Sequence, residues 1–163
     1  MIYILNNYSE TILNAEDSSQ IKALPSLKEN DFAIGSLSAP IFIFWYFDYQ
    51  CPFCKKFWKE TLPQIKLDYV NTGKVRIVYK DFPLESIHPF AEEATEITRC
   101  IQHNINNEDY LKIHNKIFEN QDSINSKNLR IWVKEIGDNV DFCLENHIYK
   151  EEIKADSNDA LKV

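Results

Sequence analysis

The stretch FDYQCPFC, at residues 47–54, lies where two sequence patterns meet. Before it, residues 41–47 (IFIFWYF) are β-branched or aromatic throughout and show no polar alternation. This pattern predicts a strand that is buried on both faces of a mixed sheet. After it, apolar residues recur at spacings of three and four up to residue 69, and the turn residues 71–73 (NTG) follow them. This second pattern predicts a helix with one apolar face, formed by Phe57, Trp58, Leu62, Ile65 and Tyr69.

A Cys-x-x-Cys pair therefore falls on the first turn of a helix that follows a buried strand. At this position the sulfur of Cys51 lies among backbone N–H groups that have no partner within the helix. Those donors, and the positive end of the helix dipole, are expected to favour the thiolate and to lower the pKa of Cys51. Lys55 and Lys56 add positive charge on the next turn. Pro52 suits an early helical position, where its missing N–H is not needed.

Cys54 lies one turn deeper and should be less exposed than Cys51. We expect Cys51 to act as the nucleophile and Cys54 to attack the mixed disulfide that forms on it. This second attack closes an intramolecular disulfide and releases the partner. The side chains expected to tune this pair or to contact a substrate are its neighbours Asp48, Tyr49, Pro52 and Phe53.

The strand, the cysteine motif and the helix together resemble the thioredoxin superfamily, specifically its DsbA-like thiol oxidoreductases. The similarity extends from about Leu27 to the C-terminus. Its other marks are Gly35 and residues 39–40 (AP) before the strand, and residues 81–84 (DFPL) with 88–89 (HP) after the next strand. The resemblance implies an α/β, thioredoxin-like fold with an inserted helical domain, and thiol-disulfide exchange as the activity. It implies no cofactor.

The resemblance also implies cysteine-containing protein substrates, a membrane or soluble redox partner, and a place in the periplasm or cell envelope. Residues 1–13 carry no positively charged n-region and too short an apolar core for a signal peptide. We therefore expect either an export signal upstream of Met1 or a protein that is not exported. The longest apolar stretch, residues 39–47, is far shorter than the roughly 20 residues of a membrane-spanning helix.

Length and charge narrow the class of protein. A chain of 163 residues is expected to form one domain with a substantial core, and its 13% aromatic content supplies side chains for that core. The formal net charge is −7, and no cluster of Lys and Arg is present to neutralise a phosphate backbone. Both facts argue against nucleic acid as a partner.

Three parts are predicted along the chain: an N-terminal extension at 1–30, a thioredoxin-like part with the cysteine motif at 31–88, and an inserted helical domain at 89–163 that packs with it as one compact unit. Residues 74–79 (KVRIVY) predict a second strand, parallel to the first. Helices are predicted at 89–103, 108–119, 127–136, 140–147 and 149–163, with Gly137 ending the third.

Cys100 and Cys143 lie on separate helices of the predicted insertion. Four cysteines allow three pairings. Related DsbA-like sequences often carry a second cysteine pair at comparable places, so the resemblance implies a structural Cys100–Cys143 disulfide. The alternative is two separate buried thiols that act as small apolar residues.

No metal site is predicted. A zinc site on Cys51 and Cys54 would need two further ligands, and the only soft candidates, Cys100 and Cys143, are expected to lie elsewhere. His88 is interpreted as a helix-entry residue rather than a catalytic one. The histidines without metal-ligand spacing are His103, His114 and His147.

Two features depart from the family pattern. Many relatives have a carboxylate six residues before the first cysteine that helps to move the proton of the buried thiol, but Trp45 holds that position here. Asp48 is then the nearest acid on the strand side, which predicts slower deprotonation of Cys54.

The chain also has no proline after Pro89. We therefore expect the family's cis-proline loop and C-terminal β-hairpin to be missing, and this chain to aggregate and to process protein substrates poorly.

The predicted function is the oxidation of cysteine pairs in unfolded or secreted proteins through Cys51 and Cys54. A reductase or isomerase of the same fold is the first alternative, because the direction of electron flow depends on the reduction potential and on the redox partner. The second alternative belongs to a different class: a truncated, impaired product or a non-catalytic binding module that keeps the cysteine motif.

Overall fold

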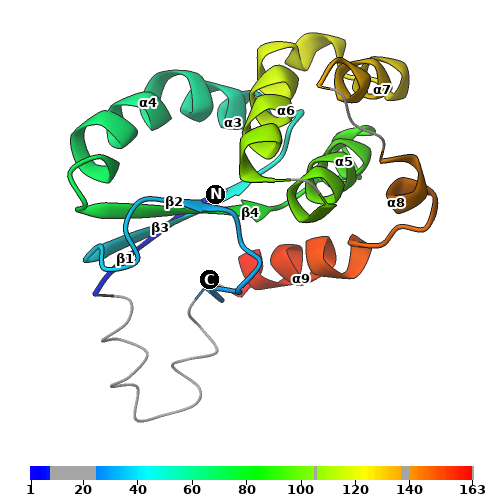
Figure 1. Ribbon diagram of the computed structural model, residues 1–163. Coiled ribbons are helices and arrows are strands. Elements are labelled where there is room, and N and C mark those ends of the chain that lie inside the picture. Colours follow the sequence, from blue (N-terminus) through cyan, green and yellow to red (C-terminus); the bar gives the residue numbers. More distant parts are fainter. Residues whose placement is uncertain (8–24, 105, 137–139, 163) are drawn as a thin grey trace.

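A four-stranded mixed sheet forms the centre of the fold. The computed structural model describes residues 1–7, 25–104, 106–136 and 140–162. The strand order is β1-β3-β4-β2, in which β3 and β4 are parallel and the two outer strands are antiparallel to their neighbours (Figure 1). The strands are β1 (Ile2–Asn6), β2 (Ala33–Ile34), β3 (Ile41–Phe47) and β4 (Val75–Asp81). The predicted buried strand and its parallel partner are therefore confirmed.

The predicted helices are also found, with ends that differ by a few residues. A continuous helix after the cysteines consists of α3 (Pro52–Lys56), the π-helical turn η1 (Phe57–Thr61), α4 (Leu62–Ile65) and a second π-helical turn, η2 (Lys66–Val70). The others are α5 (Ala91–Asn104), α6 (Asn107–Glu119), the 3₁₀ turn η3 (Gln121–Ser123), α7 (Ser126–Glu135), α8 (Asp141–Glu145) and α9 (Lys150–Ala160). The predicted stop at Gly137 lies outside the described residues.

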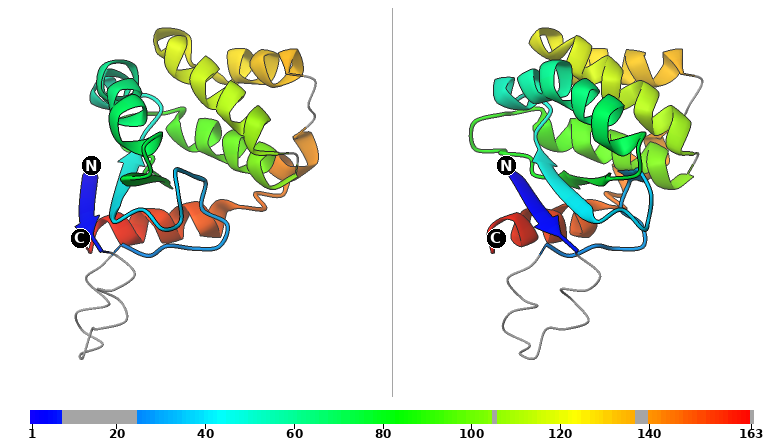
Figure 2. Two further views of the ribbon diagram at one scale, coloured as in Figure 1. Left: turned by 60° about the vertical axis from the view of Figure 1, so that its left-hand side comes forward. Right: turned by 90° about the vertical axis from the view of Figure 1, so that its left-hand side faces the viewer.

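Both faces of β3 are buried, which explains its unbroken run of apolar residues. One face is covered by the helix that follows the cysteines and by α5 and α6, and the other face is covered by α9 (Figure 2). The side chains on the first face are Ile43, Trp45 and Phe47, and those on the second face are Phe42, Phe44 and Tyr46. The cysteine loop therefore starts from a strand that is held on both sides.

The helix after the cysteines departs from a regular 3.6-residue period, and this corrects one predicted core residue. The N–H of Asn71 bonds to the carbonyl oxygen of Lys66, five residues back, as in a π-helical turn. Such a turn holds an extra residue, so the buried face moves on by one position. Val70 packs against the core, whereas Tyr69 is 48% exposed. The prediction that Tyr69 lies on the apolar face was wrong.

The N-terminal and C-terminal parts of the chain were each given a prediction. The predicted N-terminal extension contributes the edge strand β1, while residues 8–24 lie outside the described part. None of the described peptide bonds is cis. The absence of the cis-proline loop and of the C-terminal hairpin stays a prediction. The division of the chain into three parts also stays a prediction. Within the described ranges, no helix has the length and apolar character needed to cross a membrane.

Candidate active site

Cys51 and Cys54 lie at the junction of β3 and the long helix. Cys51 is the N-cap residue of α3, and Pro52 is the first helical residue, as predicted. The carbonyl oxygen of Cys51 accepts a hydrogen bond from the N–H of Lys55 (3.1 Å). Both cysteines are free thiols; Cys51 is half-buried, whereas Cys54 is buried. A partner molecule therefore reaches Cys51 more readily than Cys54.

Burial sets the acid strength of Cys54. Loss of solvation raises the pKa of the Cys54 thiol to about 12, and a negative charge on Cys51 adds to the rise. A hydrogen bond from the backbone of Asp48 works in the opposite direction. At neutral pH Cys54 is therefore protonated and a poor nucleophile, which leaves Cys51 as the sulfur available to react.

The carboxyl group of Asp48 anchors the cysteine loop. Asp48 is buried, directly after β3. Its Oδ1 accepts a hydrogen bond from the backbone N–H of Gln50 (2.7 Å), and its Oδ2 accepts one from the backbone N–H of Leu84 (2.7 Å). The Nδ1 of His88 lies 2.8 Å from the same Oδ2. Asp48 thus joins the cysteine loop to the loop after β4, and the expected tuning role of Asp48 stays a prediction.

Two glutamine side chains, which no sequence pattern marked, hold the backbone on either side of Cys51. Gln121 of η3 donates from Nε2 to the carbonyl oxygens of Tyr49 (2.7 Å) and Cys51 (3.0 Å). Gln50 accepts a hydrogen bond from the N–H of Phe90 with its Oε1 (2.6 Å). Gln121 and Cys51 are 70 positions apart in the chain, and Gln50 and Phe90 are 40 apart, so no local signal reveals either contact.

The expected contact residues differ in exposure. Phe53 is 80% exposed beside the cysteines, and Pro52 is exposed as well. Tyr49 is fully buried, and its hydroxyl oxygen lies 2.8 Å from Nδ1 of His114. The expectation that Tyr49 contacts a substrate was therefore wrong, because its ring packs inward against the core. The role of Phe53 as a contact stays a prediction.

An aromatic cluster surrounds Trp45, the residue six positions before the first cysteine. Trp45 is buried, and its ring centroid lies 5.0 Å from that of Phe57 and 5.8 Å from that of His114. Burial lowers the pKa of His114 to about 3, so this imidazole is neutral at physiological pH. With Trp45 apolar and His114 neutral, the cluster presents no charge to the cysteines.

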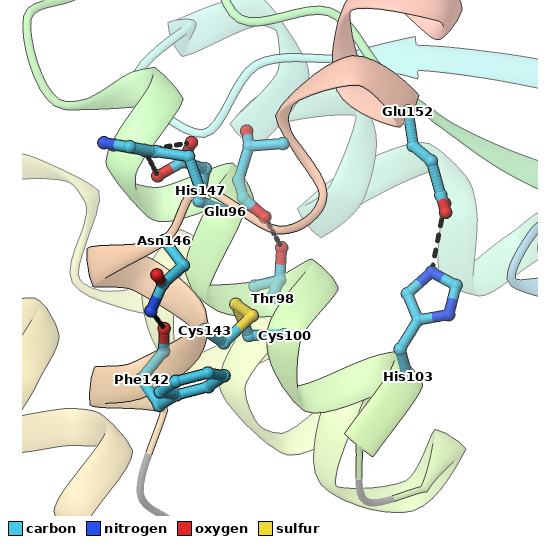
Figure 3. Close-up of a disulfide and its surroundings, with 10 residues drawn as sticks. Glu96, Thr98, Cys100, His103, Phe142, Cys143, Asn146, His147 and Glu152 are labelled. Carbon is cyan, nitrogen blue, oxygen red and sulfur yellow. Dashed lines mark hydrogen bonds and ion pairs between the residues drawn. A yellow bond between two sulfur atoms is a disulfide. The ribbon is translucent and has the colours of Figure 1, made fainter.

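A disulfide joins Cys100 of α5 to Cys143 of α8 (Figure 3). The two Cα atoms are 6.0 Å apart, and both residues are buried. The bond fixes the short helix α8 against α5, and both sulfurs are used in it. In the part of the chain that the structure describes, no group of three or more His, Cys, Asp or Glu side chains is placed to hold a metal ion.

We predict that the Cys100–Cys143 disulfide is present in protein purified from an oxidising compartment. Digestion without reductant, followed by mass spectrometry, should find these two residues linked to each other and not to the other cysteines. Replacing both with Ser should lower the free energy of unfolding by about 4 kcal/mol, since the bond closes a long loop in the unfolded chain. That loop spans 43 positions. Free thiols at both positions, or a double variant of unchanged stability, would contradict this prediction.

We also predict that Cys51 reacts first with an alkylating reagent. In reduced protein treated with less than one equivalent of iodoacetamide at about pH 6, below the ordinary thiol pKa, peptide mapping should find the label mainly on Cys51. The reason is that Cys54 is both buried and protonated under these conditions. Equal labelling of Cys51 and Cys54 would show that the two roles are assigned wrongly.

Replacing Gln121 with Leu should lower the free energy of unfolding by about 1–3 kcal/mol, because the buried carbonyl oxygen of Tyr49 loses the Gln121 donor and that of Cys51 keeps only the N–H of Lys55. Gln102 offers a matched control, since its Nε2 bonds to the carbonyl oxygen of Asn30 at the surface (2.7 Å). Denaturant unfolding of both Leu variants is the measurement. An equal loss in the two variants would mean that the position of Gln121 beside the cysteines has no special importance.

Comparison with known proteins places the chain in a family. A strand that runs into a Cys-x-x-Cys motif at the start of a helix, with a parallel strand beside it, defines a thioredoxin-like dithiol protein. The family model described as thioredoxin matches residues 27–163. The chain belongs to this thioredoxin family, and its fold is that of the DsbA-like members.

The relatives include proteins of known structure. Wolbachia pipientis α-DsbA1 is 26% identical, with a TM-score of 0.66 over 84% of this chain and 70% of that one. BdbD from Bacillus subtilis is 20% identical, with a TM-score of 0.72 over 85% of this chain and 77% of that one. A Rickettsia typhi protein, named as a candidate protein-disulfide oxidoreductase, is 26% identical over 72% of this chain. The chain spans 43% of the length of that relative.

Proposed function

We propose that this chain carries out thiol-disulfide exchange through Cys51 and Cys54, in the direction that oxidises cysteine pairs of other proteins. The observation that carries the proposal is the contrast between the two sulfurs. Cys51 is half-buried at the N-cap of a helix, and Cys54, one turn away, is buried with a raised pKa. The names of the relatives, which include DsbA proteins and protein-disulfide oxidoreductases, support the same activity.

The proposed cycle starts from a Cys51–Cys54 disulfide. A substrate thiolate attacks the sulfur of Cys51, the bond between the two sulfurs breaks, and Cys54 leaves with the electron pair and takes up a proton. A second substrate thiolate then attacks the substrate sulfur of this mixed disulfide, and Cys51 leaves as a thiolate. Once the Cys51 thiolate takes up a proton, Cys51 and Cys54 are a dithiol. Counted from two substrate thiols, the substrate has lost two electrons and two protons to form one disulfide.

The raised pKa of Cys54 lengthens the life of the mixed disulfide on Cys51. A mixed disulfide on Cys51 returns to the starting state when Cys54 attacks it as a thiolate. Burial keeps Cys54 protonated, so this return is slow and the second substrate thiol has time to react. The same raised pKa makes Cys54 a poorer leaving group in the first step, so the net direction of electron flow depends on the reduction potential of the pair and on the redox partner.

The substrates and partners follow from this chemistry. Substrates are unfolded proteins with reduced cysteine pairs, which present their thiols to Cys51 beside the exposed ring of Phe53. A second protein must take the two electrons from the Cys51–Cys54 dithiol, because the chain would otherwise turn over once. A compartment outside the cytoplasm, such as the periplasm or cell envelope, provides such substrates.

The test mixes the oxidised chain with a reduced, unfolded protein that contains one cysteine pair. Mass spectrometry after alkylation should find two thiols lost from the substrate and two gained at Cys51 and Cys54. Faster reduction of a substrate disulfide by the reduced chain would instead identify a reductase. No change of thiols in either protein would favour a non-catalytic binding module.

A further inference from the structure

We infer that His88 is a positioning residue for the cysteine pair, which it holds in place through Asp48; this inference rests on the proposed function. The two residues come from different loops. Asp48 lies three positions before Cys51, directly after β3, and His88 lies in the loop that follows β4. The Nδ1 of His88 is 2.8 Å from Oδ2 of Asp48. Because an ionised carboxylate only accepts hydrogen bonds, the Nδ1 of His88 must carry the proton and donate it.

Asp48 touches both cysteines through its backbone. Its carbonyl oxygen accepts the N–H of Cys51 (3.2 Å). Its backbone also bonds to the thiol of Cys54, where it opposes the effect of burial on the pKa. A movement of the Asp48 backbone would therefore change the surroundings of both sulfurs. Its side chain is only 2% exposed, so solvent does not readily replace a lost partner.

Three hydrogen bonds join the cysteine loop to the loop that follows β4. Asp48 accepts bonds from the backbone of Leu84 and from the ring of His88, and Gln50 accepts one from the backbone of Phe90. Of these three donors, only that of His88 belongs to a side chain. Of these three hydrogen bonds, only the one from His88 can therefore be removed by a substitution outside the cysteine loop without a change to the backbone.

The loss of this donor should affect the redox equilibrium as well as the fold. Hydrogen bonds to a charged group are among the stronger ones in proteins. Without His88, the buried carboxylate of Asp48 keeps its two backbone donors but loses the donor of the His88 ring, so Asp48 is held less firmly. The thiol of Cys54 then loses its fixed donor in the reduced state. A dithiol with a less stable reduced form is a weaker oxidant, so the equilibrium should move toward the Cys51–Cys54 disulfide.

The experiment compares His88→Ala, His88→Asn and His103→Ala in the full chain. Asn is the rescue variant, because its amide nitrogen is attached at the same carbon as Nδ1 of His. His103 is the matched control: its Nε2 lies 3.1 Å from Oε2 of Glu152, and its side chain is 15% exposed against 17% for His88. The readouts are the equilibrium constant of the cysteine pair with glutathione and the thermal unfolding midpoint.

His88→Ala should shift the equilibrium constant toward the disulfide by about threefold to tenfold, a part of the strength of one charged hydrogen bond. His88→Asn should restore most of the wild-type value, and His103→Ala should keep it. An unchanged constant in His88→Ala would overturn the inference. It would also be overturned if all three variants shifted together with their unfolding midpoints, since His88 would then be an ordinary structural residue. A wild-type chain that does not exchange with glutathione at all would instead refute the proposed function.

Discussion

Replacing Cys51 with Ser should reduce thiol-disulfide exchange to the uncatalysed rate, with small disulfides and with protein substrates alike. A hydroxyl group cannot form the mixed disulfide, and buried, protonated Cys54 cannot take over the attack. The fold should survive, because Ser is close to Cys in size and the side chain of Cys51 makes no capping hydrogen bond. The rate of reaction with glutathione disulfide, measured by mass, is the test.

The matched variant is Cys54→Ser, which should behave differently. It keeps the nucleophile but loses the sulfur that resolves the mixed disulfide, so an adduct of Cys51 with its partner should accumulate. Its mass identifies both the partner and the attacked residue. If the adduct forms in Cys51→Ser and not in Cys54→Ser, the roles of the two cysteines are the reverse of those argued above.

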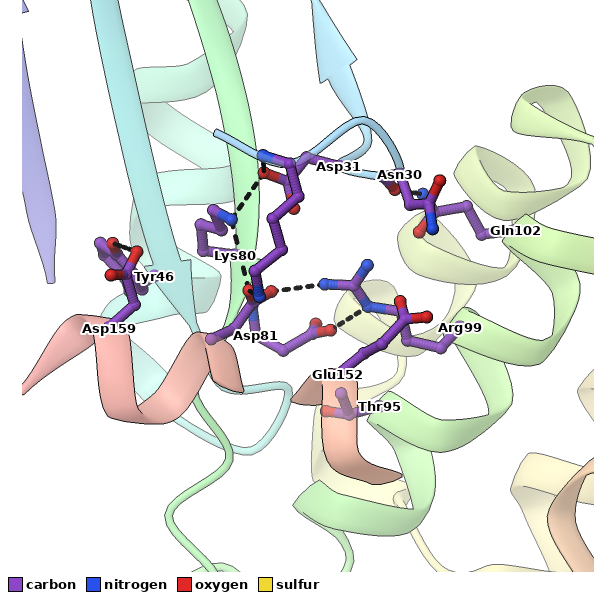
Figure 4. Close-up of polar contacts among 12 residues, drawn as sticks. Asn30, Asp31, Tyr46, Lys80, Asp81, Thr95, Arg99, Gln102, Glu152 and Asp159 are labelled. Atoms are coloured by element: carbon purple, nitrogen blue, oxygen red, sulfur yellow. Dashed lines mark hydrogen bonds and ion pairs between the residues drawn. The ribbon is translucent and has the colours of Figure 1, made fainter. Parts of the chain in front are cut away.

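The second large effect concerns stability. Replacing Arg99 with Met should lower the free energy of unfolding by about 3–5 kcal/mol, because it leaves the buried carboxylate of Asp81 without its cation and removes one of the cations of Asp156. Arg99 of α5 is 4% exposed and pairs with Asp81 at the end of β4 (Figure 4). It also pairs with Asp156 of α9 (2.5 Å). The total stability of a protein is about 5–15 kcal/mol, so this one change would remove a large part of it.

Arg99 belongs to a buried ion cluster. Its members are Asp31, Lys80, Asp81, Arg99 and Asp156. Lys80 is fully buried and lies 2.6 Å from Asp31 and 3.3 Å from Asp156. Burial raises the pKa of Asp81 to about 6 although the charge of Arg99 lowers it. The ion pairs of this cluster link four parts of the fold, which are the loop before β2, strand β4, helix α5 and helix α9.

Arg130→Met is the control for Arg99→Met. Arg130 pairs with Asp141 (2.8 Å) and Glu93 (3.7 Å), but its side chain is 41% exposed. Water screens these pairs, so the midpoint of denaturant unfolding should change little. Should the two Met variants lose equal stability, burial of the cluster would not be the reason for its contribution.

The elements next to the cysteines could be predicted because their signals are local. An unbroken apolar run describes β3 whatever lies elsewhere in the chain, and the position of Pro52 at the start of α3 follows from its own chemistry. The disulfide between Cys100 and Cys143, which the structure contains, was implied by family resemblance and not by a physical signal in the sequence.

The failures have physical causes. Two π-helical turns shift the buried face of a helix, and this placed Tyr69 wrongly. The run KEEIKADSNDA of α9 reads as a solvated helix, yet Asp156 is fully buried because cations 57 to 128 positions away surround it. The contact between Asp48 and His88 spans 40 positions. Contacts of this kind depend on the tertiary arrangement, so no window of sequence contains them.

The central claim is that Cys51 and Cys54 form one reversible redox pair. The most direct measurement is equilibration of the chain with graded ratios of reduced and oxidised glutathione, followed by acid quenching, alkylation and peptide mass analysis. We predict a single two-electron transition in which Cys51 and Cys54 change together, while Cys100 and Cys143 stay linked throughout. A Cys51–Cys54 pair that stays a dithiol at every ratio, or a transition carried by Cys100 and Cys143, would contradict the claim.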